Sequence, residues 1–143
     1  MAEGHKDYSG IPLWKKLGIV EGARVLVIGA PPTFHRGLVQ IAPLPHAVEF
    51  LSRAGRALDV AIVFATRQPA LERGFTKVKP NLQRGGRLWV AWPKKASKVP
   101  TDITFTWAQG LGLAAGMVDN KTAAIDATYQ GLQFVYRVKD RGR

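Results

Sequence analysis

The sequence predicts an α/β fold in which helices cover both faces of a mostly parallel sheet. Three segments, residues 23–28, 59–66 and 87–92, are almost wholly apolar and rich in β-branched side chains, which is typical of strands buried on both faces. Segments with apolar residues at helical spacing lie between and after these strands, so helices can form two outer layers. The chain has 143 residues, a length typical of one domain with one core.

The chain before the first strand predicts a tail and a short helix. Residues 1–10 are polar and lack the apolar centre of a signal peptide, so we expect a flexible tail there. A proline at the first turn and a glycine past the end then bound a short apolar segment: Pro12, Leu13, Trp14, Leu17 and Gly18. This arrangement predicts a short helix, which we expect to pack against an edge of the sheet.

Residues 31–56 contain four prolines and show no persistent period. Each proline removes a backbone donor and fixes φ, so neither a long helix nor a central strand fits this segment. We expect a loop or a short helix here, followed by an edge strand at residues 48–51.

The chain between the second and third strands predicts a helix. Its apolar residues recur at helical spacing after a proline at the first turn: Pro69, Leu71, Phe75, Val78 and Leu82. Pro80 should break or kink the helix near its end.

Another helix is predicted after the third strand. Thr101 and Asp102 follow Pro100 and are candidate N-caps. The residues that follow supply one apolar face and then a glycine at which the helix would end: Ile103, Trp107, Leu111, Ala114 and Gly116.

The C-terminal part predicts a closing pair of antiparallel strands, residues 118–125 and 132–138, joined by a turn at 126–131. The expected architecture is therefore a Rossmann-like three-layer sandwich, with a mostly parallel sheet and a C-terminal antiparallel strand pair. One domain would span residues 11–138, and residues 139–143 would form a basic tail.

The composition excludes several classes of site. The chain has no cysteine, which excludes disulfides, thiolate nucleophiles and thiolate-rich metal centres. Its longest apolar runs are far shorter than the roughly 20 residues that span a bilayer. We therefore expect a soluble, cytoplasmic protein with no membrane partner.

The charge is strongly positive and uneven. Lys and Arg number 21 against 10 Asp and Glu, a net charge of +11. Between residues 67 and 98 the only acid is Glu72, beside nine basic residues: Arg67, Arg73, Lys77, Lys79, Arg84, Arg87, Lys94, Lys95 and Lys98. Such a field attracts nucleic acid, phosphorylated ligands or acidic proteins, and it also keeps a protein in solution.

Three segments resemble class I methyltransferases that use S-adenosylmethionine. LGIVEGARVLVIGA (residues 17–30) resembles the lead-in and first strand of that fold, LQRGGRLWVAW (82–92) a late turn and strand, and DVAIVFAT (59–66) a strand between them. The resemblance covers about two thirds of the chain. It implies a methyltransferase fold in a chain shorter than the full enzyme.

The same resemblance implies a cofactor site, and this chain differs from the family at that site. The family has a glycine-rich turn after strand one and an acidic residue at the end of strand two. Here the turn is Gly29-Ala30-Pro31-Pro32, and the nearest carboxylate, Glu49, falls within a predicted strand. The absence of the glycine-rich turn argues against S-adenosylmethionine as a cofactor, and the sequence indicates no other.

Three further segments are similar to the signatures of a bacterial domain-of-unknown-function family of small proteins. They are YSGIPLWKKLGI (residues 8–19), AWPKKASKVPTDIT (91–104) and GMVDNKTAAID (116–126). This similarity spans nearly the whole chain but implies no activity.

The strongest candidate binding site is the loop after the third strand. In open α/β sheets ligands bind beyond the carboxyl ends of the strands, and a helix N-terminus attracts anions. The residues that would form this site are Trp92, Lys94, Lys95, Ser97, Lys98, Thr101 and Asp102. The alternative is a solvated loop in which Asp102 only caps the following helix.

Other polar residues would lie at the same edge of a parallel sheet. They follow the first two predicted strands: Thr33, His35, Arg36, Thr66 and Arg67. Asp119 and Asn120 would add polar groups nearby, although a turn before a strand explains them as well.

The sequence offers little for catalysis. His5, His35 and His46 lack the i, i+4 spacing and acidic neighbours of metal ligands, so we expect no metal site. No serine lies in a G-x-S-x-G elbow, and we name no catalytic residue.

The leading hypothesis is a noncatalytic module that binds an anionic small molecule or an acidic partner at residues 92–102. Two alternatives stay open. One is a residual S-adenosylmethionine-dependent methyltransferase, and the other is a nucleic-acid binder that uses the basic run at residues 67–98.

Overall fold

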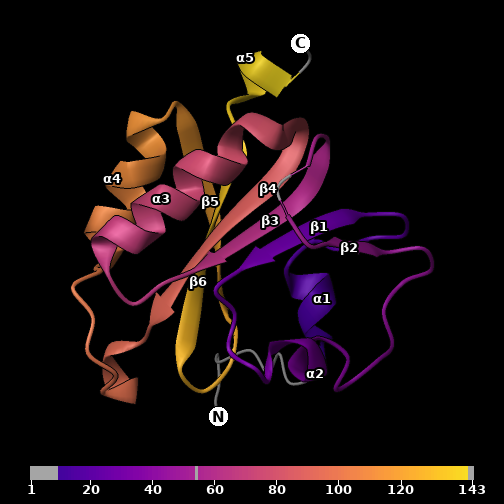
Figure 1. Cartoon of the computed structure of the whole chain (residues 1–143), viewed down its shortest axis with the longest axis horizontal. Helices are drawn as coiled ribbons and strands as arrows, with labels where there is room; N and C mark the ends of the chain where they lie inside the picture. The colour runs from indigo at the N-terminus through magenta and orange to yellow at the C-terminus, as the bar shows by residue number, and fades with distance from the viewer. Residues whose placement is uncertain (1–9, 54, 142–143) are drawn as a thin grey trace.

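A computed structural model describes residues 10–53 and 55–141. They form one six-stranded sheet with helices on both faces (Figure 1). The strands are β1 Arg24–Ile28, β2 Glu49–Leu51, β3 Leu58–Phe64, β4 Leu82–Pro93, β5 Met117–Ala124 and β6 Tyr129–Tyr136. The helices are α1 Leu13–Lys16, α2 Phe34–Leu38, α3 Gln68–Val78, α4 Phe105–Ala114 and α5 Val138–Arg141, with single 3₁₀ turns η1 Lys79–Asn81 and η2 Lys95–Ser97.

The strand order is β2-β1-β3-β4-β6-β5. The first four strands are parallel, and β6 is antiparallel to both of its neighbours. The predicted three-layer sandwich with a C-terminal antiparallel pair is therefore confirmed. The carboxyl ends of β1, β3 and β4 meet at one edge, which we call the carboxyl edge. From β1 the chain passes to β2 on one side and then to β3 on the other side of β1. The topological switch point therefore lies between β1 and β3.

Two apolar clusters lie on opposite faces of the sheet. Residues of α3 and α4 belong to one cluster, and residues of α1 and α2 belong to the other (Figure 1). The predicted placement of the first helix at a sheet edge is wrong, because α1 lies on the face. Leu13 and Leu17 are buried there, and the Trp89 indole Nε1 donates to the Leu17 carbonyl at 3.0 Å.

The α3 helix follows the prediction, and α4 begins later than expected. Pro69 lies in the first turn of α3, and the helix passes into η1 next to Pro80. The α4 helix begins at Phe105, and its N-cap is Thr104, whose hydroxyl accepts from the Trp107 amide at 3.1 Å. Neither Thr101 nor Asp102 caps α4, so that expectation is wrong.

The two ends of the chain were predicted as tails. Residues 1–9 of the expected N-terminal tail, which include His5, lie outside the residues that the structure describes. At the other end the chain forms one helical turn, α5, and the Arg141 guanidinium Nε donates to the Tyr136 carbonyl at 2.8 Å. In the described ranges, we find no helix with the length and apolar character needed to cross a membrane.

Candidate functional site

The turn after β1 holds two strand ends close together. Gly29 has φ +72°, and a Cβ added there would lie 2.6 Å from the Phe64 carbonyl oxygen at the end of β3. Only glycine fits this backbone and this contact. The next residues, Pro31 and Pro32, have no amide hydrogen, and the Pro31 carbonyl accepts from the Phe34 amide at 3.0 Å. The turn therefore offers few donors to a ligand.

Glu49 lies at the wrong end of its strand for a cofactor carboxylate. It is the first residue of β2, at the amino end, and its Oε1 lies 3.2 Å from Nη1 of Arg24. Beyond the carboxyl end of β2 the chain continues with Ser52 and Arg53. The acidic residue that the family uses is thus absent from the end of β2.

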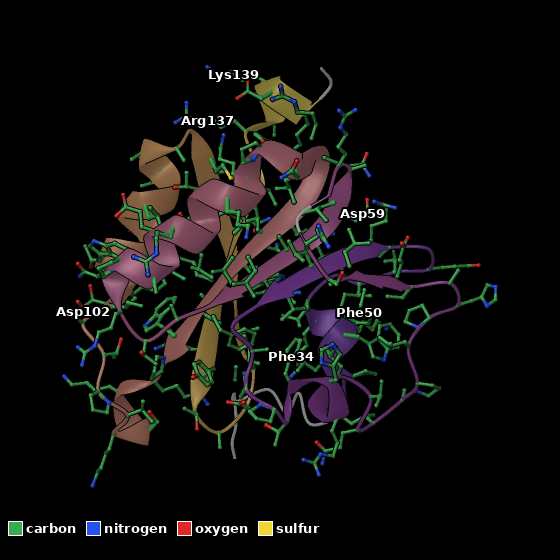
Figure 2. The ribbon with its side chains drawn as sticks, viewed as in Figure 1. Phe34, Phe50, Asp59, Asp102, Arg137 and Lys139 are labelled. Carbon is green, nitrogen blue, oxygen red and sulfur yellow. The ribbon has the colours of Figure 1, made fainter. Side chains whose placement is uncertain are left out.

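Aromatic rings pack together beside the switch point. Phe34 lies edge-on to Phe64 with ring centroids 5.2 Å apart, and Phe64 makes a similar contact with Tyr129. His35 lies 5.6 Å from the Phe34 ring and 5.0 Å from the Phe50 ring (Figure 2 labels both phenylalanines). His35 is exposed and lies against these two rings in the first turn of α2.

Thr33 and Arg36 share a small hollow of about 310 Å³ with Asp126. The Asp126 carboxylate is already engaged, because its Oδ1 accepts from the amides of Thr128 and Tyr129 at 2.8 and 2.6 Å. Arg36 is exposed. Of the residues predicted after β1, Arg36 is therefore the cation that remains available at this edge.

The loop after β4 holds its own polar groups together. Trp92 is buried with 2% of its surface exposed and belongs to the core. The Ser97 hydroxyl donates to the Lys94 carbonyl at 2.7 Å and accepts from the Val99 amide at 3.2 Å. Thr101 accepts from the amide of Ile103 at 3.1 Å. These three side chains thus have structural roles.

Asp102 caps α3 instead of the helix that follows it. Its Oδ1 accepts from the Gln68 amide at 2.8 Å, and the Gln68 side chain donates to the Asp102 carbonyl at 2.7 Å. Figure 2 shows Asp102 beside the start of α3. The carboxylate thus provides a negative charge at the N-terminus of α3, whereas the sequence predicted an anion site at the N-terminus of the following helix, α4.

The Asp102 contact predicts a stability effect. Replacing Asp102 with alanine should lower the free energy of unfolding by about 1 kcal/mol, because the Gln68 amide loses its acceptor. The Asp102→Asn variant keeps an acceptor oxygen and should lose less. Urea unfolding followed by circular dichroism measures both. Equal midpoints for Asp102→Ala and the wild type would show that this carboxylate does not cap α3.

The loops after β3 and β4 therefore meet at the carboxyl edge. Arg67 is the exposed N-cap residue of α3, and Thr66 is half-buried just before it. Lys94 is half-buried, whereas Lys95 and Lys98 are exposed. The predicted cations after β3 and β4 are thus Arg67 in one loop and the three lysines in the other.

Asp119 and Asn120 do not lie at this edge. The predicted strand over residues 118–125 contains them, and the alternative of a turn before a strand is wrong. Both lie within β5, where the register shifts between residues 119 and 121. Asp119 accepts from Gln109 of α4 at 3.2 Å, and Asn120 accepts from the buried Gln133 at 2.8 Å. The bulge directs the two residues into these internal contacts.

Four lysines lie together at a place that sequence reasoning missed. A hollow of about 880 Å³ lies between α1 and the β5–β6 hairpin, and four lysines line it: Lys15, Lys16, Lys94 and Lys121. We call it the lysine groove. The described residues that line it include no Asp or Glu. Only Lys94 belonged to the predicted site.

Lys121 shows the electrostatic character of the groove. Its Nζ donates to the Lys16 carbonyl at 2.7 Å, which ties β5 to α1. Partial burial lowers the pKa of Lys121, and the nearby charges of Arg87 and Lys16 lower it further. Like charges therefore lie close together here, and no carboxylate among the described residues lines the groove beside them.

Solved methyltransferase structures share this fold. A SAM-dependent methyltransferase from Aquifex aeolicus is 15% identical with a TM-score of 0.56, covering 85% of this chain and 86% of that chain. A TehB-like SAM-dependent methyltransferase from Corynebacterium glutamicum is 11% identical with a TM-score of 0.53, covering 94% and 90%. A magnesium protoporphyrin IX methyltransferase from Synechocystis with bound SAH is 12% identical with a TM-score of 0.56, covering 82% and 75%.

These likenesses establish the methyltransferase-like fold. No family model matches the chain, and no curated protein matches it in sequence. At identities of 11–15% the similarity concerns architecture and carries no activity with it.

Proposed function

We propose that this chain is a noncatalytic binding module, built on a methyltransferase-like fold, for an anionic ligand or an acidic partner. The observation that supports it is the charge at the carboxyl edge. Arg36, Arg67 and the lysines at 94, 95 and 98 lie in segments that follow β1, β3 and β4. These five cations outnumber the two acids nearby, Asp102 and Asp126, so the field at this edge stays positive.

The residues at the switch point fit S-adenosylmethionine poorly. Pro31 and Pro32 remove donors from the turn after β1, and no carboxylate follows β2 to bind ribose hydroxyls. No family model matches the chain, so the predicted similarity to a small bacterial family of unknown function has no support here and adds no activity. These points support binding without methyl transfer.

A residual methyltransferase is the second candidate, and Gly29 is the observation that favours it. This glycine keeps the left-handed conformation and close strand contact at the end of β1, where the fold brings backbone near a cofactor. Binding of S-adenosylmethionine at millimolar concentration, unaffected by salt, would favour this candidate over the module.

Thermal unfolding of the full chain with separate probes tests the proposal. The probes are inorganic tripolyphosphate, a glutamate-rich peptide, single-stranded DNA and S-adenosylmethionine, each at low and at moderate salt. A ligand at 100 times its dissociation constant stabilises the fold by about 2.7 kcal/mol, which raises Tm by several degrees. We expect a rise with tripolyphosphate or the peptide that shrinks with salt.

Other outcomes would replace this proposal. If none of the anions raises Tm, the binding module is refuted. A rise in Tm with S-adenosylmethionine alone would identify the methyltransferase. Preference for DNA would support the nucleic-acid alternative. The basic run at residues 67–98 does not form one stripe for DNA, because Arg73 and Lys77 lie on α3 while Arg87 approaches Gly18 beside α1 on the other face.

A further inference from the structure

The lysine groove has cationic side chains along both of its walls. Lys15 and Lys16 come from the last turn of α1, and Lys121 comes from β5 on the opposite side. Lys94 stands where β4 ends. Among the described residues, Asp126 lines an adjoining hollow that Lys16 also lines, and its Oδ1 accepts from two backbone amides. A ligand in the groove would therefore meet positive charge on either side.

Small residues form part of the floor of the groove. Ala123, Ala124 and Gly131 line it between the lysines. On this face α1 covers the sheet only in part, whereas α3 and α4 cover the other face (Figure 1). An elongated ligand with an apolar side fits such a floor, and its charged groups can reach the lysines above.

The groove also includes the outer edge of the sheet. Four consecutive residues of β5, numbers 121–124, line it, so both the face and the edge of the strand border the hollow. Among the described strands, β5 pairs with β6 alone. Its other edge can form main-chain hydrogen bonds with an extended peptide.

The composition of the lining distinguishes the kinds of anion. No aromatic or arginine side chain lines the groove in the described part. Nucleic acids are commonly held by stacking on aromatic rings and by arginine forks. Lysines around a small apolar floor beside an open strand edge instead suit carboxylates carried on a peptide.

Building on the proposed function, we infer that the lysine groove binds an extended acidic segment of a partner protein. The segment lies along β5, with carboxylates directed to Lys15, Lys16 and Lys121. The predicted loop of Lys95 and Lys98 is then a neighbouring charged surface, outside the binding site itself.

The inference predicts which lysines control peptide affinity. A fluorescent Asp- and Glu-rich peptide is titrated with the full chain and with the Lys15→Glu, Lys16→Glu double variant. The matched control is Lys95→Glu, Lys98→Glu, which changes the net charge equally beside the groove. A second control is Arg137→Glu, Lys139→Glu near α5 (Figure 2). We expect the groove variant to weaken binding about tenfold and each control to weaken it less than about threefold.

A second measurement tests the position of the peptide. Hydrogen exchange of the amides at residues 121–124 should slow when the peptide binds, while that of residues 95–98 should not change. Thermal unfolding of each variant confirms that it folds. Because Lys15 and Lys16 donate through their side chains to no described group, their replacement should leave the fold intact.

The outcomes separate this inference from the proposed function. If only the loop variant loses affinity, anion binding stands and the groove is refuted. Equal losses in all three variants would show non-specific attraction and refute the groove. Tighter binding of single-stranded DNA or tripolyphosphate, with the same loss in the groove variant, would refute the acidic peptide as occupant. A wild-type chain that binds no anion would refute the proposed function as well.

Discussion

Replacing Gly112 with alanine is expected to lower the free energy of unfolding by about 2–3 kcal/mol. Gly112 lies in α4 against β6, and a Cβ there would overlap the Phe134 ring, with Cζ only 2.6 Å away. Phe134 is fully buried and packs edge-on against Phe75 with ring centroids 5.8 Å apart. A close-packed interior leaves that ring nowhere to move, so the strain exceeds the gain of about 1 kcal/mol in helix propensity.

The control for this prediction lies two residues away in the same helix. Gly110 is exposed, and a Cβ there would meet nothing within 4 Å. Gly110→Ala should therefore stabilise the fold by about 0.5–1 kcal/mol. Urea unfolding followed by circular dichroism measures both variants. Similar stabilisation in the two would mean that α4 does not contact β6 at Gly112.

These two glycines also show where sequence reasoning reaches its limit. A glycine inside a helical pattern suggests weakness, yet α4 continues through both glycines to Ala114. The buried positions include Ala108 and Gly112, flanked by Trp107 and Leu111. The apolar spacing predicted the helix correctly. It could not show that Gly112 is small because an aromatic ring of β6 occupies the space.

The strands were predictable where both of their faces are buried. The cores of β1, β3 and β4 are continuous apolar runs, and the structure places strands on all of them. The start of β4 was not predictable, because residues 83–86 are polar or glycine and resemble a turn. In the structure these residues belong to β4. The register between β3 and β4 shifts beside them, between Leu58 and Val60.

Contacts distant in sequence explain what was missed at the candidate site. Asp102 follows a proline and precedes a helix, so local reasoning made it the cap of that helix. The parallel pairing of β3 and β4 instead brings it to Gln68, 34 residues away. Lys121 lies 105 residues from Lys16. Only the sheet order, with β5 outside β6, shows that these two lysines line one groove.

Replacing Trp89 with alanine is expected to be the most damaging single change, at about 4 kcal/mol. Trp89 is fully buried, and its Nε1 donates to the Leu17 carbonyl at 3.0 Å. A Cβ at Gly131 would lie 3.0 Å from its ring, so the indole fills the space that this glycine leaves. The α1 helix has four residues and cannot be stable alone. Its position therefore depends on this side chain.

The phenylalanine variants isolate the role of burial and keep the fold measurable. Trp14 also donates its Nε1 to a carbonyl, that of Ala42, at 3.0 Å, but it is only half-buried. Trp89→Phe should lower the free energy of unfolding by about 2 kcal/mol, because the buried Leu17 carbonyl loses its hydrogen-bond donor. Trp14→Phe should lower it by less than about 1 kcal/mol, because water can replace the indole donor. Equal losses in urea unfolding would contradict this difference. Because Trp89 holds α1 in place, Trp89→Phe should also weaken binding of the acidic peptide while the protein remains folded. A purely electrostatic attraction to the whole surface would not produce this loss of affinity.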